Sequence, residues 1–154
     1  MGLRKIKVYH CFWIIALLVL ILGFFTRDLA NDTFDINIHD TYFIIAYNHT
    51  IVMVSLYYFL FGSCYWLLQK IVKKQLNRYL TLIHCIIFFG SFLAYWTVVF
   101  YSNLIAKKTL PTSENYELIN QTLVVLFLFN VFIGLPIYLI NLLIGVFSKN
   151  STSR

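Results

Sequence analysis

Four long apolar runs dominate this chain and restrict its fold more than any other feature. Crossing a bilayer takes about 20 helical residues, and each run is long enough to do so. Only 12% of the 154 residues are charged, whereas about a quarter are charged in a typical soluble domain. The sequence therefore predicts an all-α integral membrane protein that forms a single membrane domain over residues 1–154. Its four transmembrane helices are expected at 8–25, 43–68, 80–106 and 118–147.

The short basic segment between the second and third runs makes those helices antiparallel neighbours, which favours an up-down bundle. All six acidic residues lie in the other two loops. By the positive-inside rule, both termini are then cytoplasmic, as in a multi-pass protein of the cell's inner (cytoplasmic) membrane. The net charge of +6 therefore reflects topology, and we predict no nucleic-acid partner. Nine of the twelve basic residues support this orientation: Arg4, Lys5, Lys7, Lys70, Lys73, Lys74, Arg78, Lys149 and Arg154.

Two other features of the chain have ordinary interpretations. The first apolar run follows a basic start, as in a signal peptide. However, it exceeds the usual apolar core of such peptides, and no clear small-x-small cleavage site follows it. The three cysteines all fall inside apolar runs, without the spacing of a disulfide framework or a zinc site. We expect a first transmembrane helix and buried free thiols.

The first outer loop, residues 26–42, carries the motif His-Asp-Thr-Tyr at positions 39–42. Apolar and polar residues alternate over 34–39, a pattern typical of an extended strand, here one lying on the membrane surface. The second outer loop has ordinary loop chemistry, with Pro111 as a break. The tail 148–154 is expected to be frayed.

Polar side chains cluster where the first outer loop meets the second apolar run. With a helix beginning near Tyr42, His49 would lie about 10 Å along it, at 1.5 Å per residue. An ionisable residue at that depth is a candidate functional residue. The alternative is a neutral His49 that bonds to a neighbouring helix, and the residues alone favour it. The cluster comprises His39, Asp40, Asn48, His49 and Thr50.

The stretch "ANDTFDINIHDTYFIIAYNHTIV", residues 30–52, resembles the segment joining the ninth and tenth helices of subunit I of haem–copper oxidases, the cytochrome c oxidase family. More weakly, "NRYLTLIHCIIFFGSF" resembles the entry to the eleventh helix of that family. The resemblance covers only the C-terminal helices of subunit I. It implies a small, truncated relative with four helices.

In that family, two histidines on the tenth helix ligate two different haems, because residues i and i+2 point to opposite sides of a helix. Here the position of the high-spin ligand holds Tyr47, and that of the low-spin ligand holds His49. The resemblance thus implies His49 as a candidate haem axial ligand. His39 and Asp40 match an outer pair that helps to hold a magnesium ion in the family, which makes them candidate metal ligands.

The departures from the family pattern argue against oxygen reduction. The copper ligands belong to earlier helices of the family, and the high-spin histidine is replaced by Tyr47. We expect a non-enzymatic accessory, assembly or structural component of a respiratory complex, with no cofactor. Its expected partners are the lipid bilayer and either oxidase subunits or further copies of itself. One alternative is a haem-binding electron-transfer subunit that uses His49. Another is a small channel or transporter lined by Asn48, His49 and Thr50.

Overall fold

The computed structural model describes residues 7–25, 33–38, 40–73, 76–102, 104 and 112–147. Within these residues, four helices are long and apolar enough to cross a membrane. The protein is therefore a predominantly helical, multi-pass membrane protein, as the sequence predicts. The spans are Val8–Phe25, Tyr47–Ile71, Arg78–Tyr101 and Glu117–Phe147.

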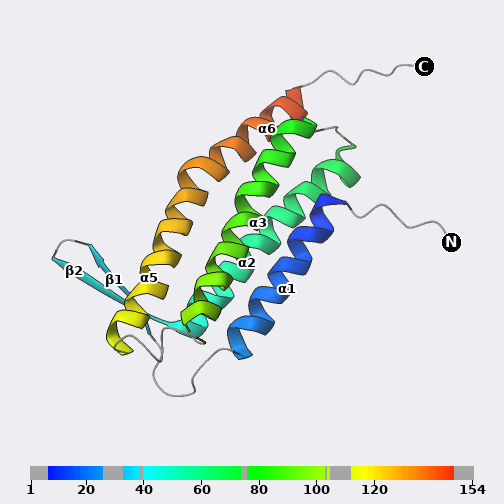
Figure 1. The fold of residues 1–154 in the computed structure, drawn as a ribbon. Helices are drawn as coiled ribbons and strands as arrows, with labels where there is room; N and C mark the ends of the chain where they lie inside the picture. Colours follow the sequence, from blue (N-terminus) through cyan, green and yellow to red (C-terminus); the bar gives the residue numbers. More distant parts are fainter. Residues whose placement is uncertain are drawn as a thin grey trace, which may run out of the picture. The chain divides into compact units, whose positions relative to one another are not determined.

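The chain divides into two compact units, Met1–Lys74 and Gln75–Arg154, here called the N-terminal and C-terminal units. The N-terminal unit holds two antiparallel helices and a β-hairpin (Figure 1). The C-terminal unit holds one helix and a second, longer helical segment that runs antiparallel to it (Figure 1).

In the N-terminal unit, α1 (Val8–Phe25) packs along α2 (Tyr47–Trp66), which continues into a π-helical turn, η1 (Leu67–Ile71). Glycine allows the backbones to approach closely. A Cβ built on Gly23 would lie 2.8 Å from the Ile51 side chain, and one built on Gly62 would lie 2.6 Å from Trp13. Small residues have this role in many membrane helix pairs. The hydroxyl of Ser55 also donates to the carbonyl of Ala16, at 2.9 Å.

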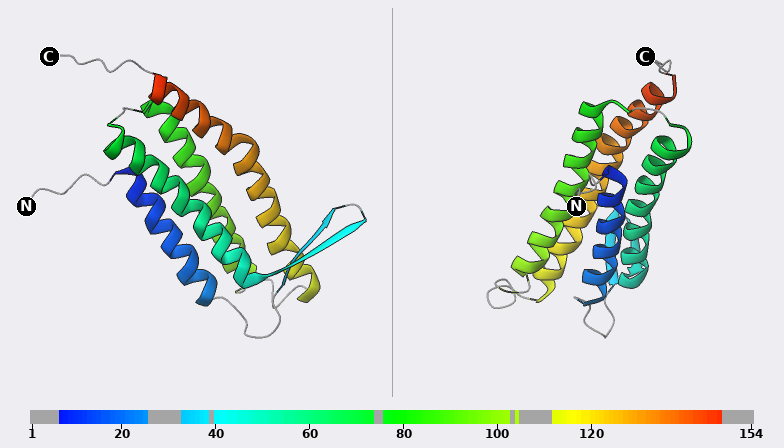
Figure 2. Two further views of the ribbon diagram at one scale, coloured as in Figure 1. Left: turned by 180° about the vertical axis from the view of Figure 1, so that it is seen from behind. Right: turned by 90° about the vertical axis from the view of Figure 1, so that its right-hand side faces the viewer.

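The hairpin consists of β1 (Thr33–Ile38) and β2 (Thr41–Ala46), which pair antiparallel. The extended strand expected from the alternating pattern is confirmed for residues 34–38. The second strand was not expected. Figure 2 shows the hairpin leaving the end of α2 sideways. Residues 26–32 of the first outer loop, and His39, lie outside the described residues.

The helix bounds expected from the sequence agree with α1, whereas the structure begins the other three helices at different residues. The second helix begins at Tyr47 rather than at residue 43, because the apolar segment Thr41–Ala46 pairs with β1. The third, α3 (Arg78–Tyr101), begins two residues early, where Asn77 caps it by accepting from the amides of Tyr79 and Leu80 at 2.9 and 3.3 Å. Its regular α-helix ends at Tyr101, and residues 105 and 106 lie outside the described residues.

In the C-terminal unit, α3 packs against a segment formed by α5 (Thr112–Phe129), a π-helical turn η3 (Asn130–Gly134) and α6 (Leu135–Phe147). This segment begins six residues earlier than the expected residue 118. The polar residues of its first turns, Thr112, Ser113 and Glu114 among them, are typical of a loop in the sequence. The turn η3 directly precedes Pro136, which has no N–H to donate to the preceding turn. The centre of the second outer loop, including Pro111, and the tail 148–154 lie outside the described residues.

Candidate functional site

Three members of the cluster singled out in the sequence, Asn48, His49 and Thr50, lie in the first turn of α2. Tyr47 is the first residue of the helix, and Ala46 precedes it without a side-chain cap. His49 therefore lies about 3 Å along the helix, at 1.5 Å per residue. The expected depth of about 10 Å is wrong because β2 takes up the residues assigned to the first turns of the helix. The side chain of His49 is exposed.

The neighbours of His49 are partly enclosed. Because residues 47–50 are helical, Tyr47 and His49 project about 200° apart and cannot serve one ligand from the same side. The side-chain oxygens of Asn48 and Thr50 are covered, and neither has a hydrogen-bond partner within the described part of the chain. His49 therefore differs from Asn48 and Thr50, since its side chain is exposed and their oxygens are covered.

The N-terminal unit does not fit a haem held between its two helices. Ile51, two residues beyond His49, fills the space beside Gly23, and Trp13 fills the space beside Gly62. With the hydrogen bond from Ser55 to Ala16, these contacts bring α1 and α2 together at three levels, and a porphyrin does not fit between the helices there. A haem bound to His49 would lie on the outer side of α2.

A second axial ligand for such a haem is not supplied by the described histidine of α1. His10 belongs to the first turn of α1, whereas Gly23, at the other end, packs beside Ile51. Thirteen helical residues separate the two levels, or about 20 Å at 1.5 Å per residue. His49 as a haem ligand stays a prediction that the N-terminal unit by itself does not support.

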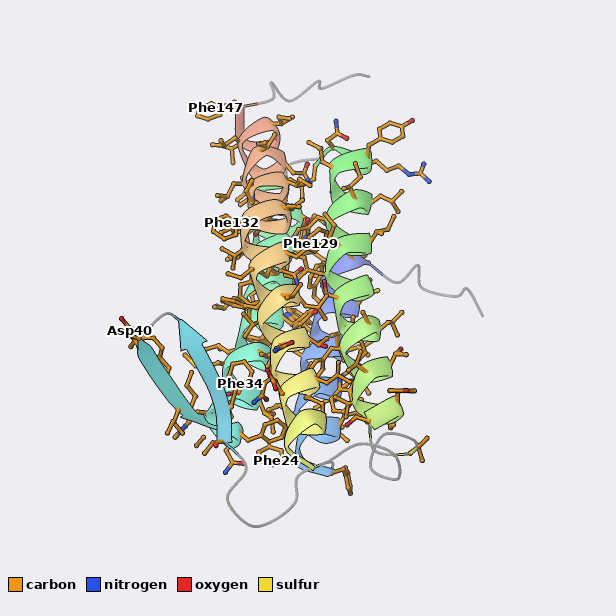
Figure 3. All side chains as sticks on the ribbon, turned by 60° about the vertical axis from the view of Figure 1, so that its left-hand side comes forward. Phe24, Phe34, Asp40, Phe129, Phe132 and Phe147 are labelled. Carbon is orange, nitrogen blue, oxygen red and sulfur yellow. The ribbon has the colours of Figure 1, made fainter. Side chains whose placement is uncertain are left out.

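His39 and Asp40 are the candidate metal ligands. Asp40 is exposed at the far end of the hairpin (Figure 3), and His39 lies outside the described residues. Among the residues that are described, no group of three His, Cys, Asp or Glu side chains is placed to hold a metal ion. A metal bound by His39 and Asp40 therefore remains a prediction.

The histidine that the structure encloses is His84, in the C-terminal unit. Its side chain is 0% exposed, although it lies within the membrane span of α3. The imidazole stacks on the ring of Tyr138, with centroids 5.0 Å apart, and contacts the ring of Phe88 at 4.4 Å. The sequence alone does not single out His84 as a site residue.

Close to His84, a polar network joins α3 to α6. The amide nitrogen of Asn141 donates to the hydroxyl of Thr81 at 2.8 Å, and its oxygen accepts from the backbone N–H of Asn77 at 3.0 Å. Thr81 in turn donates to the carbonyl of Asn77 at 2.9 Å. Asn141 is 0% exposed. Because both the nitrogen and the oxygen of the Asn141 amide are hydrogen-bonded, this network joins the two helices.

The sequence of the chain also shows which protein family it belongs to. The chain matches the sequence profile of the family described as Cytochrome C and Quinol oxidase polypeptide I over residues 3–109. The matched part includes α1, the hairpin, α2 and α3, and thus His49 and His84. The segment from α5 to α6 lies outside it. No solved structure matches the chain. Since the match covers most of the 154 residues, the chain belongs to the family of cytochrome c and quinol oxidase polypeptide I.

Proposed function

We propose that this protein is a non-catalytic membrane component of a respiratory oxidase complex, with an accessory, assembly or structural role. The observation that carries the proposal is Tyr47. This residue begins α2 at the position where the family resemblance places the histidine of the oxygen-reducing haem. A chain without that ligand keeps the membrane part of the family while lacking the centre at which oxygen reacts.

The packing of the N-terminal unit supports the same function. Here Gly23 and Gly62 bring α1 and α2 into direct contact. Such a helix pair is suited to be a rigid packing element, and its outer surface offers many large apolar side chains to lipid or to other transmembrane helices.

The proposal includes a location and an orientation. The distribution of basic residues favours the cytoplasmic membrane with both termini on the cytoplasmic side. A reporter enzyme fused after Arg154 is expected to be active only on the cytoplasmic side, and one inserted at Pro111 only on the opposite side. The reverse pattern would contradict the orientation.

Purification from native membranes tests the proposed role. We expect the affinity-tagged full-length protein, extracted in a mild detergent, to bring oxidase subunits with it. Replacement of His49 by alanine should leave this association unchanged, because no cofactor at His49 is required. A Gly62→Leu variant, which forces α1 and α2 apart, should lose it.

Two results would contradict the proposed role. Purification as a homo-oligomer without oxidase subunits would do so, as would ion flux through liposomes that contain the protein alone. The second result would favour the channel alternative, in which Asn48, His49 and Thr50 line the path.

A further inference from the structure

We propose that the β1–β2 hairpin is an interfacial lipid anchor, with one of its faces seated at the boundary between lipid headgroups and acyl chains. This inference concerns a surface of the N-terminal unit and does not depend on the proposed role in an oxidase complex. It follows from the register of the hairpin, from the exposure of its side chains and from its junction with α2.

The register divides the hairpin into two faces. In an antiparallel pair, directly opposed residues share a face, and successive residues alternate between the faces. Phe34 is opposite Ile45, and Ile36 is opposite Phe43. The phenylalanine face is thus formed by positions 34, 36, 38, 41, 43 and 45, and the aspartate face by positions 33, 35, 37, 42, 44 and 46.

The composition of the two faces differs. The phenylalanine face carries five large apolar residues and one threonine, Thr41. The aspartate face carries Thr33, Asp35 and Asn37 along β1, and Tyr42, Ile44 and Ala46 along β2. An amphipathic ribbon of this kind has one face suited to an apolar environment and a polar strand on the other face.

Exposure shows that the phenylalanine face is only partly covered by the protein itself. Near the junction with α2, Phe34 is 6% exposed, but Phe43, farther along the same face, is 48% exposed. A two-stranded hairpin is marginally stable by itself in water. Phe43 therefore marks an apolar surface on which a further contact would stabilise the hairpin.

The lipid surface is the occupant favoured by continuity. β2 leads directly into α2, and the exposed residues of the adjoining turns of α2, among them Val52, Met53 and Leu56, form its lipid-facing side. The hairpin leaves this end of α2 sideways (Figure 2). It therefore begins at the end of a membrane span whose exposed side chains are apolar.

The polar parts of the hairpin locate it at the membrane surface rather than in the hydrocarbon core. Asp40 is exposed at the far end (Figure 3), and a carboxylate is costly within the core. The open edges of a two-stranded ribbon also carry backbone groups that need hydrogen-bond partners, which water and headgroups supply and acyl chains do not. Aromatic side chains such as Phe43 suit the apolar side of the same boundary.

Phe43 and Ile44 provide a matched pair for the test. They are neighbours in β2, both are exposed, at 48% and 63%, and the register places them on opposite faces. A cysteine introduced at either position, in full-length protein whose three native cysteines are replaced by alanine, can carry an environment-sensitive NBD fluorophore. The labelled proteins are reconstituted into phosphatidylcholine vesicles, and equal helicity by circular dichroism confirms that both variants fold.

We expect the probe at position 43 to emit at shorter wavelength and to lose fluorescence to lipids that carry a nitroxide near the headgroup. The probe at position 44 should instead be quenched by iodide in the aqueous phase. Equal iodide quenching at both positions, without lipid quenching, would overturn the proposal. A probe at position 43 shielded from both quenchers would also overturn it, in favour of a protein partner or a second copy on this face.

A second measurement avoids the cysteine replacements. p-Cyanophenylalanine at position 43 or 44 of the otherwise unaltered chain reports hydration through its nitrile stretching frequency. The lipid anchor predicts a dehydrated nitrile at position 43 and a hydrated one at position 44. Equal hydration at the two positions would contradict it.

Discussion

The two units share close glycine contacts between helices, but they differ in the other side chains that join them. A Cβ built on Gly134 would lie 2.6 Å from the ring of Phe88, just as one built on Gly62 would lie 2.6 Å from Trp13. In the N-terminal unit, α1 and α2 also meet through aromatic contacts, in which the ring of Phe12 is tilted against those of Phe61 and Tyr65. In the C-terminal unit, α3 and α6 meet through a buried amide, that of Asn141, and a fully enclosed histidine, His84.

The contrast is sharpest in the two histidines. His49, which matches the family's haem-ligand position, is exposed in the first turn of its helix, whereas His84 is enclosed by aromatic rings. Similarity to a cofactor motif thus does not identify the histidine on which the packing of this protein depends. Burial does.

Replacing the two histidines should give the largest difference in stability between the two units. We predict that His84→Ala lowers the free energy of unfolding by about 3 kcal/mol, because it empties the space between Phe88 and Tyr138. His49→Ala should change it by less than about 0.5 kcal/mol, as at other exposed positions. Unfolding by SDS in mixed micelles, followed by circular dichroism, measures both values.

A His84→Phe variant sharpens this comparison. A phenyl ring is somewhat larger than the imidazole but fills the same space and keeps the ring contacts, so the loss should be smaller than for alanine. Equal destabilisation by His84→Ala and His49→Ala would show that burial does not distinguish the two residues.

The close approach of α1 and α2 gives the next largest effect. An alanine Cβ at Gly62 would lie 2.6 Å from the indole of Trp13 and 3.1 Å from the Cβ of Phe12, so one of the helices must shift. We predict a loss of about 1–3 kcal/mol in the free energy of unfolding. Gly90→Ala in α3 is the control, since a Cβ there meets nothing within 4 Å. If both variants unfold alike, the close contact between α1 and α2 is wrong.

The interhelical hydrogen bonds give the smallest effects. An interhelical bond in a membrane contributes about 0.6 kcal/mol on average. Asn141→Ala removes two such bonds and should cost about 1 kcal/mol, whereas Ser55→Ala removes one and should cost about half as much. The same unfolding experiment gives both values, and a larger loss for Ser55→Ala would reverse the assigned difference between the units.

Hydropathy predicted the four membrane helices because a backbone in lipid must satisfy its own hydrogen bonds, which leaves little choice but helix. It failed at Thr41–Ala46. That apolar, β-branched segment is compatible with helix and strand alike, and its pairing with β1 decides between them. The misplaced start of α2 put His49 about 10 Å along the helix, whereas the observed start puts it about 3 Å along.

The sequence predicts the buried faces of the helices better than it predicts the candidate site. Small and polar residues recur at helical spacing and mark the buried side, as in the series Asn130, Gly134, Tyr138, Asn141 and Gly145. Thr81, His84, Phe88 and Ser91 form the corresponding series on α3. This pattern is the signal that would have identified His84, because polar side chains in lipid-facing helices turn towards the protein.

The absorption spectrum of the purified full-length protein, after expression with an ample supply of haem, tests the non-catalytic assignment most directly. We predict no Soret band, no haem on extraction, and identical spectra for the wild type and His49→Ala. A Soret band that disappears in His49→Ala but persists in His84→Phe would contradict this prediction. It would assign the exposed histidine of α2 as a haem ligand and the protein as an electron-transfer subunit.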